Sequence, residues 1–183
     1  MYYRGRTIHD LTAEESASSI GFVQQNPDNQ IVTDYVWHEL AFGLENMALP
    51  VQDIRRRVSE MASFFGMEEW FHKKTCQLSG GQKQMLNLAA VMAMDPEVLI
   101  LDEPTNGLDP LGIEELRELI RSFPCKGITV ILSSHILSEV QQIADHVGII
   151  AGGVLGYEGE LRAGEDLEQL FMDVIRRNGK EGY

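Results

Sequence analysis

Two adjacent carboxylates, Asp102 and Glu103, are the residues of this chain whose types and position are best suited to chemistry. They follow the apolar run Val-Leu-Ile-Leu at 98–101, which predicts a buried strand that ends at the two acids. Open α/β sheets bind ligands at the carboxyl ends of their strands. Acids at such an edge are typical of nucleotide enzymes, where they hold magnesium and orient a water molecule.

A serine followed by two glycines marks a second candidate site, in the sequence Leu-Ser-Gly-Gly-Gln-Lys-Gln at 78–84. Ser79 is a favourable N-cap, and the helix that opens at Gly80 or Gly81 is predicted to end at Asp95-Pro96. The first turn of a helix presents free backbone N–H groups and a positive dipole end. This arrangement commonly holds phosphate.

Three more polar residues adjoin predicted strands and helices. Gln25 follows the short apolar strand 20–23, His135 follows the strand 128–132 through two serines, and Asp109 precedes Pro110 at a helix start. From the residues alone, Gln25 is a polar surface group in a turn and His135 is a loop residue. Asp109 fits a helix cap. Asp102 could likewise only cap the turn after it, but the motifs around it favour a role in chemistry over this simple structural role.

Strands and helices alternate in the second half of the chain. Strands are predicted at 98–101, 128–132 and 147–150, and helices at 110–123 and 136–144. This alternation predicts an α/β fold with a mostly parallel sheet. A hairpin turn is predicted at Gly152-Gly153, leading into 154–157, and a last helix at about 166–177. The segment from Thr33 to Met94 has a helical pattern instead.

These motifs, in this order and spacing, closely resemble those of the ABC transporter ATPases, from about Ile20 to Glu160. The resemblance implies a P-loop-NTPase-like core with an inserted α-helical subdomain. It divides the chain into a core remnant with the Q-loop at 1–32 and a helical subdomain ending in the signature helix at 33–94. The core with the Walker B, D-loop and H-loop segments follows at 95–163, and a C-terminal helix at 164–183.

Two stretches of the chain resemble different branches of this family. The stretch 23–65 looks most like cassettes that import metals or vitamins through energy-coupling factors. The stretch 113–159 looks more like cassettes that export peptides or lantibiotics. A fusion of two cassettes near 102–110 is therefore one interpretation of the sequence.

The resemblance also assigns roles to the motif residues. Glu103 is implied to polarise the attacking water, Asp102 to hold magnesium, and His135 to contact the γ-phosphate of ATP. Gln25 is implied to reach the magnesium or water, and Asp109 to lie in the loop that touches the opposing subunit. In the family, two cassettes pack head to tail, and the signature binds the ATP held by the other subunit; here the signature residues are Ser79, Gly80, Gly81 and Gln82.

The family also needs a phosphate loop, G-x-x-x-x-G-K-[ST], ahead of the Q-loop. No such pattern occurs in the 183 residues; their one Gly-Lys pair, Gly179-Lys180, has Val174 and Glu181 at the other key positions. The resemblance then implies that the loop, the strands before it and the helix behind it are missing. We expect no ATP hydrolysis by the isolated chain and an exposed apolar face on its sheet. Two alternatives remain: a degenerate cassette that donates its signature to an intact partner, and a truncated or recombined gene product.

Composition limits the other function classes. The net charge of −13 argues against a nucleic-acid surface. The interval from Gln25 to Ser79 is too short for the coiled-coil insertions of chromosome-maintenance ATPases. Cys76 and Cys125 fit no paired metal spacing. No signal peptide or membrane helix is visible, so we expect a cytoplasmic protein held at the membrane by a separate permease, which the helical subdomain would contact.

Overall fold

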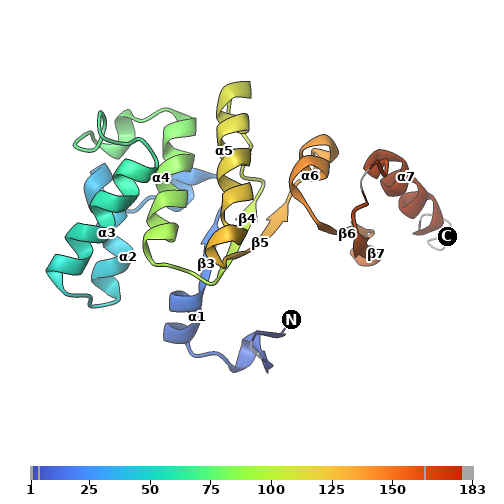
Figure 1. The fold of residues 1–183 in the computed structure, drawn as a ribbon, viewed down its shortest axis with the longest axis horizontal. Helices are drawn as coiled ribbons and strands as arrows, with labels where there is room; N and C mark the ends of the chain where they lie inside the picture. Colours follow the sequence, from blue (N-terminus) through green and yellow to red (C-terminus); the bar gives the residue numbers. More distant parts are fainter. Residues whose placement is uncertain (1, 4, 163, 179–183) are drawn as a thin grey trace. The chain divides into compact units, whose positions relative to one another are not determined.

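The computed structural model describes residues 2–3, 5–162 and 164–178, and these fall into two compact units, 1–133 and 134–183. Figure 1 shows the elements of both units in sequence order. Among the described residues, no helix combines the length and the apolar character that crossing a bilayer requires.

The first unit contains a three-stranded parallel sheet. Its strands are β3 (Ile20–Val23), β4 (Val98–Asp102) and β5 (Thr129–Ser133), in the order β3-β4-β5. The register pairs residue 20 with 98 and residue 98 with 129, so all three strands end at the same edge. The predicted strands at 20–23, 98–101 and 128–132 are confirmed, and these three are parallel.

Three helices pack together beside this sheet: α2 (Val36–Asn46), α3 (Val51–Phe64) and α4 (Gly80–Ala93) (Figure 1). Their contact surfaces are fully buried at Leu40 and Leu44 of α2 and at Leu86 and Leu88 of α4. The four-residue spacing in α2 places its leucines on one face of the helix, which is the face that packs on α4.

The two faces of the parallel sheet differ. Gly21 and Leu99 lie on the face that packs against α4. A side chain larger than glycine at position 21 would collide with Val91 of that helix. On the opposite face, Phe22 is 47% exposed and Ile131 is 38% exposed. Parallel sheets are normally covered on both faces. The expected exposed apolar face is therefore present.

Helix α5 (Pro110–Ser122) connects β4 to β5, and its buried side chains Leu116 and Ile120 face the core. Proline at its first position suits a helix start, where a missing N–H costs nothing. The short 3-10 helices η3 (Thr75–Gln77) and η4 (Pro124–Lys126) lie in the connections before α4 and β5.

The N-terminal part of the first unit is a short hairpin and one helix. Strands β1 (Tyr2–Tyr3) and β2 (Arg6–Thr7) pair antiparallel, and the 3-10 helix η1 (Ile8–Asp10) leads to α1 (Ala13–Ser19). Thr12 and Glu15 form a capping box at the start of α1. The Glu15 carboxylate also pairs with Arg6 at 2.9 Å, which lowers the pKa of Glu15 to about 2.

The second unit consists of α6 (Leu137–Ile143), β6 (His146–Ala151), β7 (Val154–Glu160) and α7 (Leu167–Asn178). Its core is the cluster Val147, Ile149, Leu167 and Val174. Strand–helix alternation predicts a parallel partner for 147–150, but β6 pairs antiparallel with β7. The predicted turn explains the difference, because Gly152 and Gly153 both adopt positive φ and bring the two strands together locally.

Candidate functional site

Asp102 and Glu103 lie at the carboxyl end of the central strand, where the sequence predicts them. Both side chains are half-buried. The Oδ1 atom of Asp102 accepts a hydrogen bond from the hydroxyl of Ser133, at 2.6 Å. The register explains this contact, because Ser133 of β5 is paired with Asp102 of β4.

Ser133 also contacts the backbone of the second acid. The Glu103 N–H donates to the Ser133 carbonyl oxygen at 3.1 Å and lies 3.3 Å from the Ser133 hydroxyl oxygen. One serine therefore bridges the two acids. The sequence placed Ser133 in a motif with His135 but did not indicate this bridge; the signal for it is a hydroxyl at the end of the strand next to the acids.

The backbone of Glu103 adopts an unusual conformation. Its φ of 46° lies in the left-handed region, which costs a residue other than glycine on the order of 1–3 kcal/mol. The Ser133 contacts help to hold this conformation. A strained backbone persists only where the surrounding structure holds it against its local preference. Residues in such conformations cluster at functional sites.

The start of α4 is capped by its own side chains. The Ser79 hydroxyl accepts from the Gln82 N–H at 3.2 Å, and the Gln82 side-chain oxygen accepts from the Ser79 N–H at 3.0 Å. This capping box leaves the N–H groups of Gly80 and Gly81 without a partner inside the helix. Gly80 is exposed and Gly81 half-exposed, so an anion could approach these two donors.

The turn after the acids packs on this helix start. A side chain larger than glycine at position 81 would lie 3.2 Å from Leu108 Cδ2, so the glycine permits a close approach. Asp109 then caps α5, and its Oδ1 accepts from the Gly112 N–H at 2.8 Å. The expected helix-cap role of Asp109 is confirmed, and its contact with an opposing subunit stays a prediction.

Gln25 leaves the sheet at the same edge as the acids, two residues after the β3 position that pairs with Leu101. Its side chain is exposed. The turn that carries it is fixed by Gln30, which accepts from the Gln24 N–H at 2.9 Å and donates to the Phe22 carbonyl at 3.0 Å. The turn at 26–29, directly after Gln25, contains the 3-10 helix η2 (Pro27–Asn29).

Two side chains of α4, the signature helix, hold this turn against the helix. Lys83 forms an ion pair with Asp28 at 2.5 Å. Asn87 is 1% exposed and donates to the Pro27 carbonyl at 3.1 Å. The sequence did not single out Lys83 or Asn87, because nothing local shows that α4 will lie against the turn.

His135 belongs to the second unit, between β5 and α6, and its side chain is exposed. The Ser134 hydroxyl accepts from the Ile136 N–H at 3.1 Å and so orders the turn around His135. The structure therefore brings together Asp102, Glu103 and the end of β3 within one unit, and places the histidine in the other.

The carboxylates suit magnesium that arrives with a nucleotide. Among the described residues, no group of three or more His, Cys, Asp or Glu could hold a metal ion. Magnesium needs only one or two protein carboxylates when phosphate oxygens and waters complete its octahedron. Asp102 uses Oδ1 for Ser133 and retains Oδ2, a hard oxygen donor that fits this requirement.

The family model described as "ABC transporter" matches residues 1–106 of the 183. The energy-coupling factor transporter ATP-binding protein of Staphylococcus aureus is 42% identical over 179 residues, covering 95% of this chain and 66% of that protein. The corresponding protein of Methanocaldococcus jannaschii is 38% identical over 160 residues, covering 87% and 55%.

Solved structures show the same fold. A subunit of the cbiONQ ABC transporter complex of Clostridium perfringens has a TM-score of 0.78 and 34% identity, over 97% of this chain and 70% of that one. A dimeric ATP-binding cassette with ADP and Pi bound has a TM-score of 0.75 and 25% identity, over 88% of this chain and 73% of the other.

The chain spans only part of its relatives, from 29% of three Bacillus proteins to 66% of the staphylococcal one. Its similarity to the staphylococcal protein nevertheless runs through both the helical segment and the segment after the acids. With the family model matching more than half of its residues, the chain belongs to the ATP-binding subunits of ABC transporters.

Proposed function

We propose that the chain is the nucleotide-binding part of an energy-coupling factor type ABC transporter, in which ATP hydrolysis drives transport through a separate permease. In this proposal Glu103 polarises the attacking water, Asp102 binds the magnesium that accompanies ATP, and His135 contacts the γ-phosphate. Gln25 reaches the same magnesium or water from the end of β3. The observation that carries the proposal is the Ser133 bridge, which holds both acids at the sheet edge.

Bound magnesium would neutralise charge on the phosphates, and the protein would position the ion, the phosphates and the attacking water. Ser133 orients Asp102 through Oδ1, so the other carboxylate oxygen is the one presented to the ion. The left-handed backbone of Glu103 turns its side chain out of the regular strand direction. Both effects place carboxylate oxygens where a triphosphate and its water would have to lie.

The signature acts on a second cassette in this proposal. Ser79, Gly80, Gly81 and Gln82 would contact ATP held by a partner packed head to tail, and Asp109 would lie in the contact loop. The two glycine N–H groups at the positive end of α4 suit the terminal phosphates. The dimeric relative that carries ADP and Pi supports this assignment.

Hydrolysis by the isolated 183-residue chain is not expected. None of its residues forms the G-x-x-x-x-G-K-[ST] pattern. Hydrogen bonds to charged phosphate contribute about 1.5–3 kcal/mol each, and each 1.4 kcal/mol changes affinity about tenfold. Without three or four such bonds, ATP would bind several powers of ten more weakly.

The permease would contact the helical part of the first unit. Tyr35, Trp37 and Phe42, at and after the start of α2, are 38%, 41% and 39% exposed. The rings of Tyr35 and Trp37 stack with centroids 6.5 Å apart. Exposed aromatic side chains close together are typical of protein interfaces. These aromatic side chains therefore support contact with a membrane-embedded permease, and with it the expected location at the cytoplasmic face of the membrane.

The proposed role of Glu103 can be tested in a fusion protein that supplies a phosphate loop. A strand-loop-helix segment with a phosphate loop, taken from the staphylococcal relative, is placed ahead of residue 1. We expect ATP hydrolysis that falls at least about 100-fold in Glu103→Gln, because positioned acid–base groups contribute at that level. Glu114→Gln, an exposed change on α5, is the matched control. Hydrolysis that survives Glu103→Gln would refute the assignment of the base.

A second candidate function is a non-catalytic cassette that donates only its signature. The capping box favours it, because the helix start is complete without any residue of a phosphate loop. The test mixes the chain with an intact relative whose own signature serine is changed to arginine. Hydrolysis that needs Ser79 but tolerates Glu103→Gln would support donation in trans. If no mixture hydrolyses ATP, the truncated or recombined gene product becomes the better explanation.

A further inference from the structure

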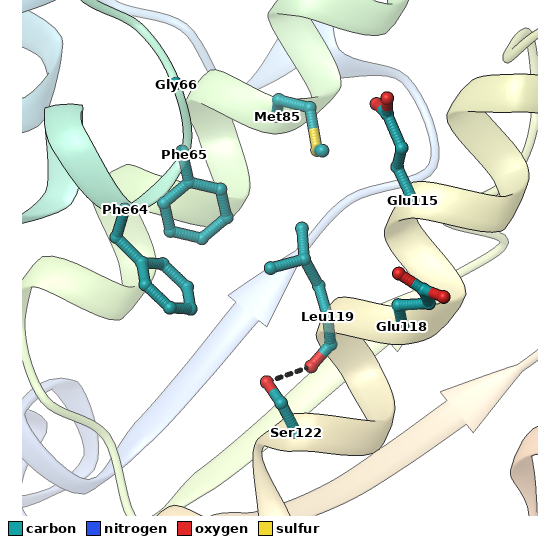
Figure 2. Close-up of a pocket in the computed structure, with 8 residues that line it drawn as sticks. All are labelled: Phe64, Phe65, Gly66, Met85, Glu115, Glu118, Leu119 and Ser122. Carbon is teal, nitrogen blue, oxygen red and sulfur yellow. Dashed lines mark hydrogen bonds between the residues drawn. The ribbon is translucent and has the colours of Figure 1, made fainter.

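An open groove runs between the end of α3, the signature helix and α5, all within the first unit (Figure 2). Its volume is about 560 Å³. Figure 2 shows the rings of Phe64 and Phe65 on one side, Leu119 opposite them on α5, and Met85 of α4 beside both. This size falls within the range of small-molecule sites, about 300–1,000 Å³.

The groove combines an apolar interior with a negative rim. Glu115 and Glu118 lie one turn apart on α5, and both carboxylates are exposed at the edge of the groove (Figure 2). Within the described residues, neither forms an ion pair with a cationic side chain. The one hydroxyl in the lining, that of Ser122, already donates to the Leu119 carbonyl at 2.7 Å. Both carboxylates are therefore open to a cation from solution.

The protein itself places an ammonium group on this surface. Lys126 Nζ lies 3.7 Å from the centroid of the Phe64 ring, which is 42% exposed. Ammonium groups are attracted to the negative face of an aromatic ring. One face of the Phe64 ring is thus already used by Lys126, and the cation partners that remain at the groove are the two carboxylates beside its apolar interior.

We propose that this groove binds a small organic amine with an apolar body, whose ammonium group lies beside Glu115 and Glu118. The apolar body packs on Phe65, Met85 and Leu119. The groove is lined by α4, which is capped by Ser79, and by α5, which is capped by Asp109. An occupant therefore contacts both of these helices. The binding itself does not depend on the proposed function.

The test compares 4-phenylbutylamine with its neutral isostere 4-phenyl-1-butanol. The full chain is labelled with methyl-13C methionine, and the Met85 signal is identified among the eight methionines by Met85→Leu. We expect the amine to shift the Met85 methyl saturably and to bind about fivefold more tightly than the alcohol. The double variant Glu115→Gln/Glu118→Gln removes this preference, and Glu114→Gln leaves it unchanged.

The variant Lys126→Met provides an independent test of amine binding. It removes the native ammonium from the Phe64 ring, so the amine is expected to bind about two- to threefold more tightly. Saturation-transfer spectra of the amine give the same comparison from the ligand side. Equal binding of amine and alcohol would overturn the proposal, as would an unmoved Met85 signal. Displacement of the amine by a short lysine-rich amphipathic peptide at tenfold lower concentration would identify a protein segment as the occupant and also overturn it.

Discussion

The Ser133 bridge can be tested without nucleotide. Replacing Ser133 by valine removes the hydroxyl that donates to Asp102 Oδ1 at 2.6 Å, and replacing it by threonine keeps that hydroxyl. Valine and threonine are both β-branched and nearly equal in size, so the pair isolates the hydrogen bond from strand propensity. A hydrogen bond to a charged group contributes about 1.5–3 kcal/mol.

The expected effect is at the low end of that range. Ser133 is exposed and Asp102 half-buried, so water replaces part of the lost bond. The Glu103 N–H keeps its bond to the Ser133 carbonyl at 3.1 Å in both variants and adds little to the difference. We expect Ser133→Val to be about 1 kcal/mol less stable than Ser133→Thr, a fall in Tm of about 2–4 °C for a chain of this length.

Urea denaturation followed by circular dichroism measures this difference, with the two variants compared at equal m-value. A double-mutant cycle with Asp102→Ala then isolates the pair, and we expect a coupling of about 1 kcal/mol. Equal stability of the valine and threonine variants, together with a coupling below about 0.3 kcal/mol, would show that the serine does not hold the acid. The geometry proposed for the magnesium site would then lose its main support.

Three further outcomes are expected. The double variant Phe22→Ser/Ile131→Ser should lower concentration-dependent association in analytical ultracentrifugation, because it removes apolar side chains from the uncovered sheet face; unchanged association would place the contact elsewhere. Gly21→Ala should destabilise the first unit by about 1–3 kcal/mol in urea, since the added methyl collides with α4, and a neutral result would mean that α4 can move away. The Glu15 pKa is lowered to about 2, chiefly by its hydrogen bond to Arg6. The stabilisation from Glu15 should therefore be complete above its ordinary value near 4.5 and disappear as pH falls through about 2. Hydrogen exchange at the Glu15 amide, with Glu15→Gln as the pH-insensitive control, measures this.

Local interactions made much of the fold predictable. The Ser79 cap depends on residues three positions apart, as does the Asp109 cap of α5, and both are visible in the sequence. The apolar runs before the acids and before His135 predicted two strands of the sheet, and the glycine pair at 152–153 predicted a hairpin. Residue types and their spacing are sufficient here because the partners are close together in the chain.

The contacts that define the candidate site are different in kind. Ser133 meets Asp102 across 31 residues, Lys83 meets Asp28 across 55, and Asn87 meets Pro27 across 60. No periodicity or propensity indicates such pairs, because they depend on strand register and on which face of α4 lies against the turn. The groove of Phe64 and Glu115 likewise exists only once α3, α4 and α5 have packed.

The amino-acid sequence by itself determined the family and the order of strands and helices, and it named the candidate residues for chemistry. Only the tertiary structure decided which serine holds the acids, which side chains tie the turn at 26–29 to α4, and which apolar groups stay uncovered. The physical reason is that hydrogen bonds within a helix or turn are set by neighbouring residues. Contacts between elements require the closure of long loops and follow from the packing of the whole unit.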